Sequence, residues 1–151
     1  MPADSQVSNQ TEADFAGRRD ISVKIQKSFF SGGKETMSMH TVAVMGLGVR
    51  GKIHLHGLLE NPDYYKVVGL CDIDEPKMKA VAEEYHLDDV PLFTDAEEML
   101  KETRPEIFVF VTYPDLRLSV IQLAVKYGVK GISFEKPMAE SLQEAKKIVK
   151  L

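Results

Sequence analysis

The chain has 151 residues, 44% hydrophobic and 28% charged, a composition typical of one soluble globular domain. Its 19 Lys and Arg residues against 23 Asp and Glu give a net charge of −4, and no dense basic cluster occurs, which argues against a nucleic-acid-binding protein. The longest apolar run, residues 107–111, is far shorter than the roughly 20 residues of a membrane helix. The one cysteine, Cys71, excludes a disulfide framework and a cysteine-based zinc cluster, and favours the cytoplasm.

Residues 1–39 differ from the rest of the chain. They carry as many acidic as basic residues, their apolar residues are scattered, and they match neither a secretory signal nor an acid-poor transit peptide. We expect a disordered or weakly ordered N-terminal arm. Met37 and Met39 precede the first strand, so whether the arm is native, or the chain begins at one of these methionines, stays open.

From residue 40 onward, short apolar runs alternate with segments of helical spacing. The pattern predicts strands at 41–45, 65–71, 91–93, 107–111 and 131–134. It predicts helices at 52–60, 75–85, 94–101, 116–127 and 141–151. Two of them begin with a capping box: Thr94 with Glu97 opens the helix at 94–101, and Ser141 with Glu144 opens the helix at 141–151. The alternation indicates an α/β fold with a doubly wound parallel sheet. We expect this domain to span residues 40–151 and to be cut short in its last helix.

Residues 46–51 read G-x-G-x-x-G between a predicted strand and a predicted helix. In this setting the pattern is typical of a dinucleotide-binding site. Gly46 permits the tight turn, Gly48 lets the backbone approach a pyrophosphate, and Gly51 lets the helix pack closely on the strand. Amides at the start of the helix, together with its dipole, can hold the anion.

Other interpretations of the glycine turn stay open. Gly46, Gly51 and Lys52 also fit the start of a P-loop, but Ile53 stands where that motif needs a hydroxyl for Mg²⁺. A methyl-donor (S-adenosylmethionine) fold has a similar turn and does not need Gly51. A glycine turn without any ligand is the third possibility.

Asp72 ends the second predicted strand, about 20 residues after the glycine loop, where an acid accepts hydrogen bonds from a ribose 2′-hydroxyl. A carboxylate there attracts the free hydroxyl of NAD and repels the 2′-phosphate of NADP. Ile73 follows in place of an arginine, and we expect Lys77 and Lys79 to face solvent. The sequence therefore favours NAD over NADP, with a plain turn-forming role of Asp72 as the alternative.

Glu135 and Lys136 follow the last predicted strand. Ligands in open parallel sheets bind beyond the carboxyl ends of the strands, so we expect both residues at the edge that holds the glycine loop. A lysine there can hydrogen-bond a substrate hydroxyl and help its proton leave during hydride transfer. Judged by position alone, a solvated lysine is an equal alternative.

Four segments occur in the order and at the spacing of one family: VAVMGLGVRGKIH (42–54), CDID (71–74), FVTYP (110–114) and FEKP (134–137). Over residues 40–151 the sequence resembles the N-terminal domain of the Gfo/Idh/MocA oxidoreductases, and the E-K-P segment is the specific element. The resemblance implies a Rossmann domain of an enzyme that transfers a hydride between NAD(P) and a hydroxyl or carbonyl of a sugar, cyclitol or similar small molecule.

The resemblance also implies which residues act. Lys136 matches the catalytic lysine, and no metal ligand is implied. The residues that match cofactor-binding positions are Gly46, Gly48, Val49, Arg50, Gly51, Asp72, Thr112, Pro114, Glu135 and Lys136. Departures occur in the family's T-P-P-x-x-H loop, where Tyr113 replaces a proline and Arg117 replaces the histidine.

Members of this family also have an α+β substrate domain, which carries most substrate contacts and the oligomer interface. The 151 residues contain no counterpart, so we expect the chain alone to be inactive. The first hypothesis is an NAD-dependent oxidoreductase, present here as its cofactor domain, with a polyol or sugar-like substrate and a homo-oligomer formed through the other domain. The alternative is a stand-alone NAD-binding sensor or interaction module without catalysis.

Histidine and cysteine often form metal or catalytic sites, but the sequence does not support such a site here. His54 and His56 lie two apart on a predicted helix, so their side chains point to different faces and cannot share a metal ion. We expect His54 to pack or cap, and Cys71 to be a small buried filler.

Overall fold

The computed structural model describes residues 38–151, and the predicted N-terminal arm lies outside this part except for its last two residues. One five-stranded parallel sheet runs in the order β3-β2-β1-β4-β5. The strands are β1 (His40–Met45), β2 (Tyr65–Cys71), β3 (Leu92–Phe93), β4 (Ile107–Phe110) and β5 (Gly131–Phe134). The helical segments are α2 (Val49–Leu59), α3 (Glu75–Glu84), α4 (Ala96–Thr103), the 3-10 turn η1 (Pro114–Leu116), α5 (Arg117–Lys126) and α6 (Leu142–Ile148).

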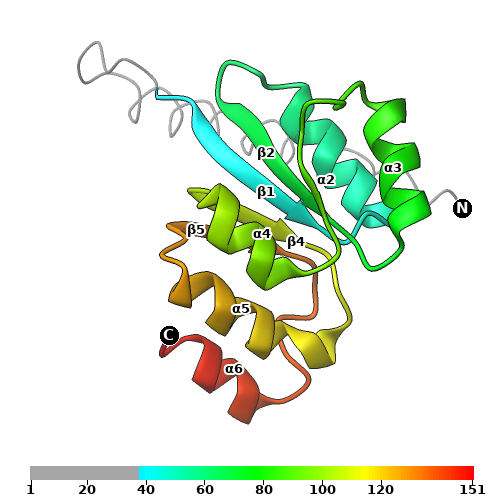
Figure 1. The fold of residues 1–151 in the computed structure, drawn as a ribbon. Helices are drawn as coiled ribbons and strands as arrows, with labels where there is room; N and C mark the ends of the chain where they lie inside the picture. Colours follow the sequence, from blue (N-terminus) through cyan, green and yellow to red (C-terminus); the bar gives the residue numbers. More distant parts are fainter. Residues whose placement is uncertain (1–37) are drawn as a thin grey trace, which may run out of the picture. The chain divides into compact units, whose positions relative to one another are not determined.

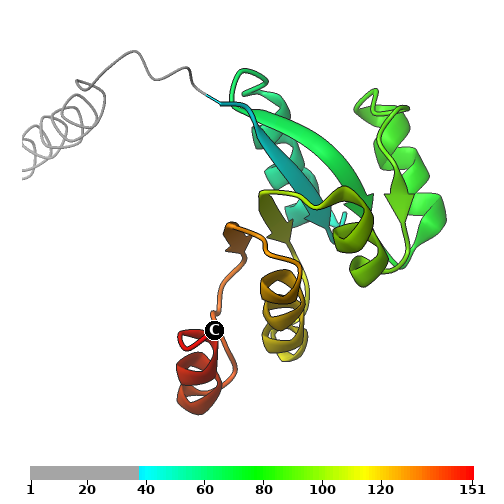
Figure 2. The same cartoon turned by 60° about the vertical axis from the view of Figure 1, so that its left-hand side comes forward.

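Helices cover both faces of the sheet, as the predicted doubly wound α/β fold requires (Figure 1). Alternate residues of β1 point to opposite faces, so Val42 and Val44 pack under α2 and α3, while Ala43 packs under α4 and α5. Helix α6 packs beside α5 rather than on the sheet (Figure 2). The fold is therefore a Rossmann-like α/β domain. Within residues 38–151 no helix is both long and apolar enough to cross a membrane.

The ends of several predicted elements differ from those in the structure. Helix α4 is capped by Asp95, whose side chain accepts a hydrogen bond from the Glu98 amide at 2.8 Å, so the predicted capping box at Thr94 is wrong. Only one residue can take the N-cap conformation, and Asp is at least as strong a cap as Thr. Ser141 caps α6 as predicted, accepting from the Glu144 amide at 3.2 Å. That helix ends at Ile148 rather than at residue 151.

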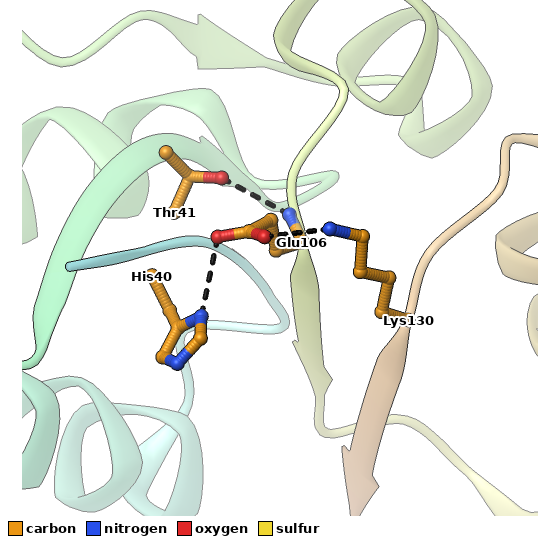
Figure 3. Close-up of polar contacts among 4 residues, drawn as sticks. All are labelled: His40, Thr41, Glu106 and Lys130. Carbon is orange, nitrogen blue, oxygen red and sulfur yellow. Dashed lines mark hydrogen bonds and ion pairs between the residues drawn. The ribbon is translucent and has the colours of Figure 1, made fainter. Parts of the chain in front are cut away.

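A polar cluster joins the amino ends of β1, β4 and β5, at the edge opposite the glycine loop (Figure 3). Glu106 Oε2 lies 3.2 Å from His40 Nδ1, and its other oxygen accepts from Lys130 Nζ at 2.8 Å. The Glu106 amide donates to Thr41 Oγ1 at 3.0 Å. Hydrogen bonds and charge from Lys130, and then from His40, hold the pKa of Glu106 below its ordinary value. The contacts of the Glu106 carboxylate with Lys130 and His40 therefore stabilise the start of the sheet most strongly while Glu106 is ionised.

We expect Glu106→Gln to lower the thermal midpoint at about pH 7, where the wild-type carboxylate is charged in both folded and unfolded chains. The pKa of Glu106 is lower in the folded chain than in the unfolded chain, where it is about 4.3. The stability that this shift contributes is present above the unfolded pKa and is lost as the pH falls through the folded pKa. The difference between variant and wild type should therefore be largest near pH 7 and shrink as the pH falls below the unfolded pKa and through the folded one. Thermal unfolding at neutral and at acidic pH measures it. A difference that persists in acid would contradict the electrostatic explanation, and Glu83→Gln, on an exposed helix position, is the matched control.

Cys71 closes β2 in the core, with 2% of its surface exposed, which confirms the expected buried filler. Burial raises the pKa of its thiol to about 12, and the nearby carboxylates of Asp95 and Asp72 act in the same direction. Because the thiolate is the reactive species, this cysteine is inert in the folded chain.

A thiol reagent should therefore report unfolding of the whole domain. At about pH 8 we expect Cys71 to react at least about 10³-fold more slowly in the native chain than in denaturant, because the thiolate is scarce and covered. Absorbance of the released reagent follows the reaction, and the denatured chain, which has the same single thiol, is the control. Complete labelling of the native chain during mixing would show that the end of β2 is open to solvent.

Candidate functional site

All five strands are parallel, so their carboxyl ends meet along one edge of the sheet (Figure 1). The glycine loop follows β1 and Asp72 follows β2 at this edge. Thr112 and Pro114 follow β4, and Glu135 with Lys136 follows β5. The structure thus places every predicted site residue at the carboxyl edge, where open parallel sheets bind their ligands.

Two glycines of the loop are required by the fold itself. Gly46 has a φ of +85°, and a Cβ on it would lie 2.1 Å from the carbonyl oxygen of Val111. A Cβ on Gly51 would lie 1.7 Å from the carbonyl oxygen of Gly46. Any side chain at either position collides with backbone, so these glycines let the turn close between β1 and α2.

Gly48 is different, because a Cβ there would meet nothing within 4 Å. It is the N-cap of α2, which begins at Val49 rather than at the predicted Lys52, and no side chain caps this helix. The first-turn amides consequently have no intrahelical partner. Val49 is 81% exposed, and Arg50 is exposed beside it. Packing within the domain does not require a glycine at position 48. An open, uncapped helix start with a glycine at its N-cap does fit a bound pyrophosphate.

Asp72 ties the glycine loop to the end of β2. Its buried carboxylate accepts hydrogen bonds from the amide of Leu47 at 2.6 Å and from the amide of Asp74 at 3.0 Å. Burial alone would raise the pKa of Asp72, but the Asp74 and Leu47 amides and the Lys77 ammonium together outweigh it and hold this pKa below its ordinary value. Asp72 is therefore ionised at neutral pH and fixed at the carboxyl edge.

The Lys77 side chain is 39% exposed, so it does reach solvent as expected, but it also makes a contact that the sequence did not predict. Its Nζ lies 2.9 Å from Asp72 Oδ1, in an ion pair across the turn between β2 and α3. Lys79, by contrast, is 65% exposed and pairs with Glu75 on the helix surface. A local pattern would not reveal the Lys77 contact, because it depends on how α3 starts after Asp74, the residue that caps it.

Glu135 is held by a residue far away in the sequence. Its Oε1 lies 3.1 Å from Nε2 of His54, so His54 pairs across the site rather than merely packing or capping as expected. The hydrogen bond to His54, followed by charge from His54 and Arg50, keeps the pKa of Glu135 below its ordinary value against a smaller effect of burial. This contact joins α2 to the end of β5.

Arg117 is the residue whose contacts the sequence left open, and it is 2% exposed. Its Nη2 donates to the backbone carbonyl of Lys136 at 3.2 Å, and its guanidinium lies 5.8 Å from the centroid of the Phe134 ring. Within residues 38–151 its Nε and Nη1 have no hydrogen-bond partner. The buried Arg117 thus fixes the backbone of Lys136 from inside the domain, while Lys136 itself is exposed.

The loop after β4 contributes less fixed structure. Thr112 Oγ1 donates to the Tyr113 carbonyl at 3.4 Å, and Pro114 opens η1. Tyr113 and Ile73 are large apolar residues that sequence reasoning did not assign to the site, and they are 79% and 90% exposed at its edge. Within residues 38–151 no group of three or more His, Cys, Asp or Glu residues could hold a metal ion.

The contrast between two loop glycines is testable by stability alone. We expect Gly51→Ala to destabilise the domain by at least about 2 kcal/mol, because its Cβ collides with the Gly46 carbonyl. Gly48→Ala should cost less than about 1 kcal/mol, because its Cβ enters open space at a helix N-cap. Urea unfolding of both variants measures the two values. Equal losses would mean that the loop does not have this geometry.

Comparison with known proteins agrees with this arrangement. Residues 40–151 match the Gfo/Idh/MocA model, described as an oxidoreductase family with an NAD-binding Rossmann fold. The chain is 27% identical over 116 residues to an uncharacterized protein of Saccharomyces cerevisiae, covering 76% of this chain and 33% of that protein. It is 28% identical over 108 residues to inositol 2-dehydrogenase/D-chiro-inositol 3-dehydrogenase of Lacticaseibacillus casei, covering 72% of this chain and 31% of the enzyme.

A solved structure shows the same fold. The chain superimposes on myo-inositol dehydrogenase from Lactobacillus casei, solved with NAD(H) and myo-inositol, with a TM-score of 0.67 and 26% identity. The match covers 75% of this chain and 33% of that one. The chain spans about a third of the length of the curated relatives that it matches. The family match, the fold and the geometry of the carboxyl edge agree, and the chain belongs to the Gfo/Idh/MocA oxidoreductase family as its NAD-binding Rossmann domain.

Proposed function

We propose that this domain is the cofactor-binding part of an oxidoreductase that acts on a hydroxyl or carbonyl of a polyol, sugar or similar small molecule. The bound nicotinamide would supply the chemistry by accepting or donating a hydride. The proposal rests on one observation: the open start of α2, the Asp72 carboxylate and the consecutive residues Glu135 and Lys136 all lie at the carboxyl edge of the sheet.

Different residues of this chain would bind different parts of the dinucleotide. Amides of Gly48, Val49 and Arg50 would hold the pyrophosphate, because the helix start is uncapped and open. Asp72, ionised and fixed, would orient the adenosine ribose. Two further predicted positions, Thr112 and Pro114, would line the cofactor where the loop after β4 lies at the same edge.

Lys136 is the residue we assign to proton transfer. Its backbone is fixed by Arg117 while its side chain is exposed, so Nζ is free to reach a substrate hydroxyl. There it would assist the departure of the hydroxyl proton, or return it in the reverse direction. Glu135, the residue before it, is held by His54 and stays ionised at neutral pH.

The substrate class comes from the relatives. An inositol dehydrogenase is among the curated matches, and the superimposed myo-inositol dehydrogenase was solved with its polyol. Because the chain spans about a third of such proteins, we propose that substrate contacts and an oligomer interface lie in a further domain. The lone buried cysteine supports a reducing, cytoplasmic setting for this activity.

Cofactor binding tests the proposal on the chain as it is. We expect saturable binding of NADH, followed by the fluorescence of the nicotinamide itself, since the chain has no tryptophan. Gly48→Asp should weaken binding by at least about 100-fold, because it puts a carboxylate where the pyrophosphate lies. Folding should be kept, since Asp is a good N-cap and its Cβ has room. Gly57→Asp, farther along the same helix with equally open space, is the matched control. A folded chain that binds no NADH would contradict the proposal.

Lys136→Ala separates catalysis from binding. The Kd for NADH should change by less than about 3-fold, because we assign the lysine side chain to the substrate hydroxyl. Where the domain is joined to a substrate domain, kcat should fall by about 100-fold or more, the contribution of a positioned acid–base group. Steady-state kinetics with a polyol such as myo-inositol measures this effect. An unchanged kcat would remove Lys136 from the reaction and favour an NAD-binding module without catalysis.

A further inference from the structure

The outer face of α2 carries a stripe of exposed residues, here called the α2 stripe: Arg50, Ile53, Gly57 and Glu60. Successive members are three, four and three residues apart, so they lie along one side of the helix. The other side packs on the sheet through the buried Leu55. The stripe thus presents one large apolar side chain, Ile53 with 55% of its surface exposed, between a cation and an anion.

Ile53 stands on a ridge between two hollows. One, of about 640 Å³, opens between α2 and α3, which lie together on one face of the sheet (Figure 1). The other, of about 330 Å³, lies between α2 and the strands β4 and β5, with Gly57, Tyr65 and Val109 in its lining. Ile53 lines both hollows. A ridge flanked by grooves is the surface onto which a second helix packs, because its side chains can enter the grooves.

Gly57 is the member of the stripe that the domain itself does not explain. It lies inside α2, and a Cβ on it would meet nothing within 4 Å. A glycine inside a helix is destabilising relative to alanine, and no close approach within residues 38–151 requires it. The missing side chain leaves a gap one helical turn from Ile53, of the kind that a side chain from a second helix can fill.

The stripe is complementary to itself. Arg50 and Ile53 lie five and two residues before position 55, and Glu60 and Gly57 lie five and two residues after it. A second α2 that runs antiparallel, related by a two-fold axis at this position, therefore places its Ile53 at the gap of Gly57. The same operation places its Glu60 opposite Arg50. A two-fold axis makes each of these contacts twice.

Both charges of the stripe are available for such a contact. Arg50 makes no ion pair within residues 38–151. Glu60 lies 4.0 Å from His56 on its own helix, and its side chain is 68% exposed. An Arg50 guanidinium from a second copy can therefore reach the Glu60 carboxylate without breaking a buried contact.

We propose that the α2 stripe is an interface for a second copy of this chain, formed by two antiparallel α2 helices about a two-fold axis. Ile53 of each copy fills the gap at Gly57 of the other, and Arg50 of each pairs with Glu60 of the other. The symmetric order of the charges and of the gap selects a second copy as the occupant. The interface needs no bound cofactor, so it does not depend on the proposed function. It is also separate from an oligomer interface in a further domain.

Sedimentation equilibrium of the chain tests this interface. A contact of this small size predicts a reversible dimer with a Kd of about 10–100 µM. Arg50→Glu and Glu60→Arg each put like charges together twice, so each should raise the Kd at least about 10-fold. An equimolar mixture of these two variants restores opposite charges at both contacts. It should form a heterodimer within about 3-fold of the wild-type affinity.

Two further variants separate the gap and the net charge. Gly57→Gln fills the gap with a better helix former, so the fold should be kept while the dimer Kd rises at least about 10-fold. Glu83→Lys, at an exposed position of α3 outside the stripe, changes the net charge as Glu60→Arg does. It is the matched control and should leave the Kd unchanged. Circular dichroism checks that each variant is folded.

A wild-type chain that stays monomeric up to about 500 µM would overturn the proposal and leave the stripe to another occupant, such as a further domain. A dimer that survives all the stripe variants would overturn it as well. So would a mixture of folded Arg50→Glu and Glu60→Arg chains that associates no better than either variant alone.

Discussion

The close approach of Gly51 to the carbonyl of Gly46 is the constraint on which the site depends. It brings the start of α2 against the end of β1, and it leaves the first-turn amides uncapped at the carboxyl edge. Asp72 fixes the same turn from its other side through the Leu47 amide. The geometry that can hold an anion is therefore made by backbone contacts, which explains why Gly48, the one loop glycine with free space, points to a ligand rather than to the fold.

Three polar contacts between distant segments hold the rest of the edge in place. Asp72 joins the end of β2 to the glycine loop, His54 joins α2 to Glu135, and Arg117 joins α5 to the backbone of Lys136. These contacts fix the Leu47 amide, the Glu135 carboxylate and the Lys136 carbonyl, while Gly48 and Lys136 stay exposed. Cofactor and substrate would thus meet side chains that are supported from within the domain, an arrangement that limits the entropy lost on binding.

Local patterns in the sequence carry most of the fold. Buried strands appear as short apolar runs, helices as periodic stripes, and the glycine loop and Asp72 are recognisable from their positions between these elements. What escapes local patterns depends on long-range packing. The pairing of His54 with Glu135 and the burial of Arg117 join segments that only the finished sheet brings together. The earlier start of α2 and the ion pair of Lys77 follow from turn geometry that residue types alone do not specify.

The central claim is that a dinucleotide lies along the carboxyl edge, over the glycine loop. Backbone amide NMR of the chain during titration with NADH tests it most directly. The account predicts the largest shift changes at Leu47, Gly48, Val49 and Arg50, with further changes near Asp72 and Lys136. It also predicts none at the His40–Glu106–Lys130 cluster of the opposite edge. Changes centred on that opposite edge, or no localised changes at saturating NADH, would contradict it.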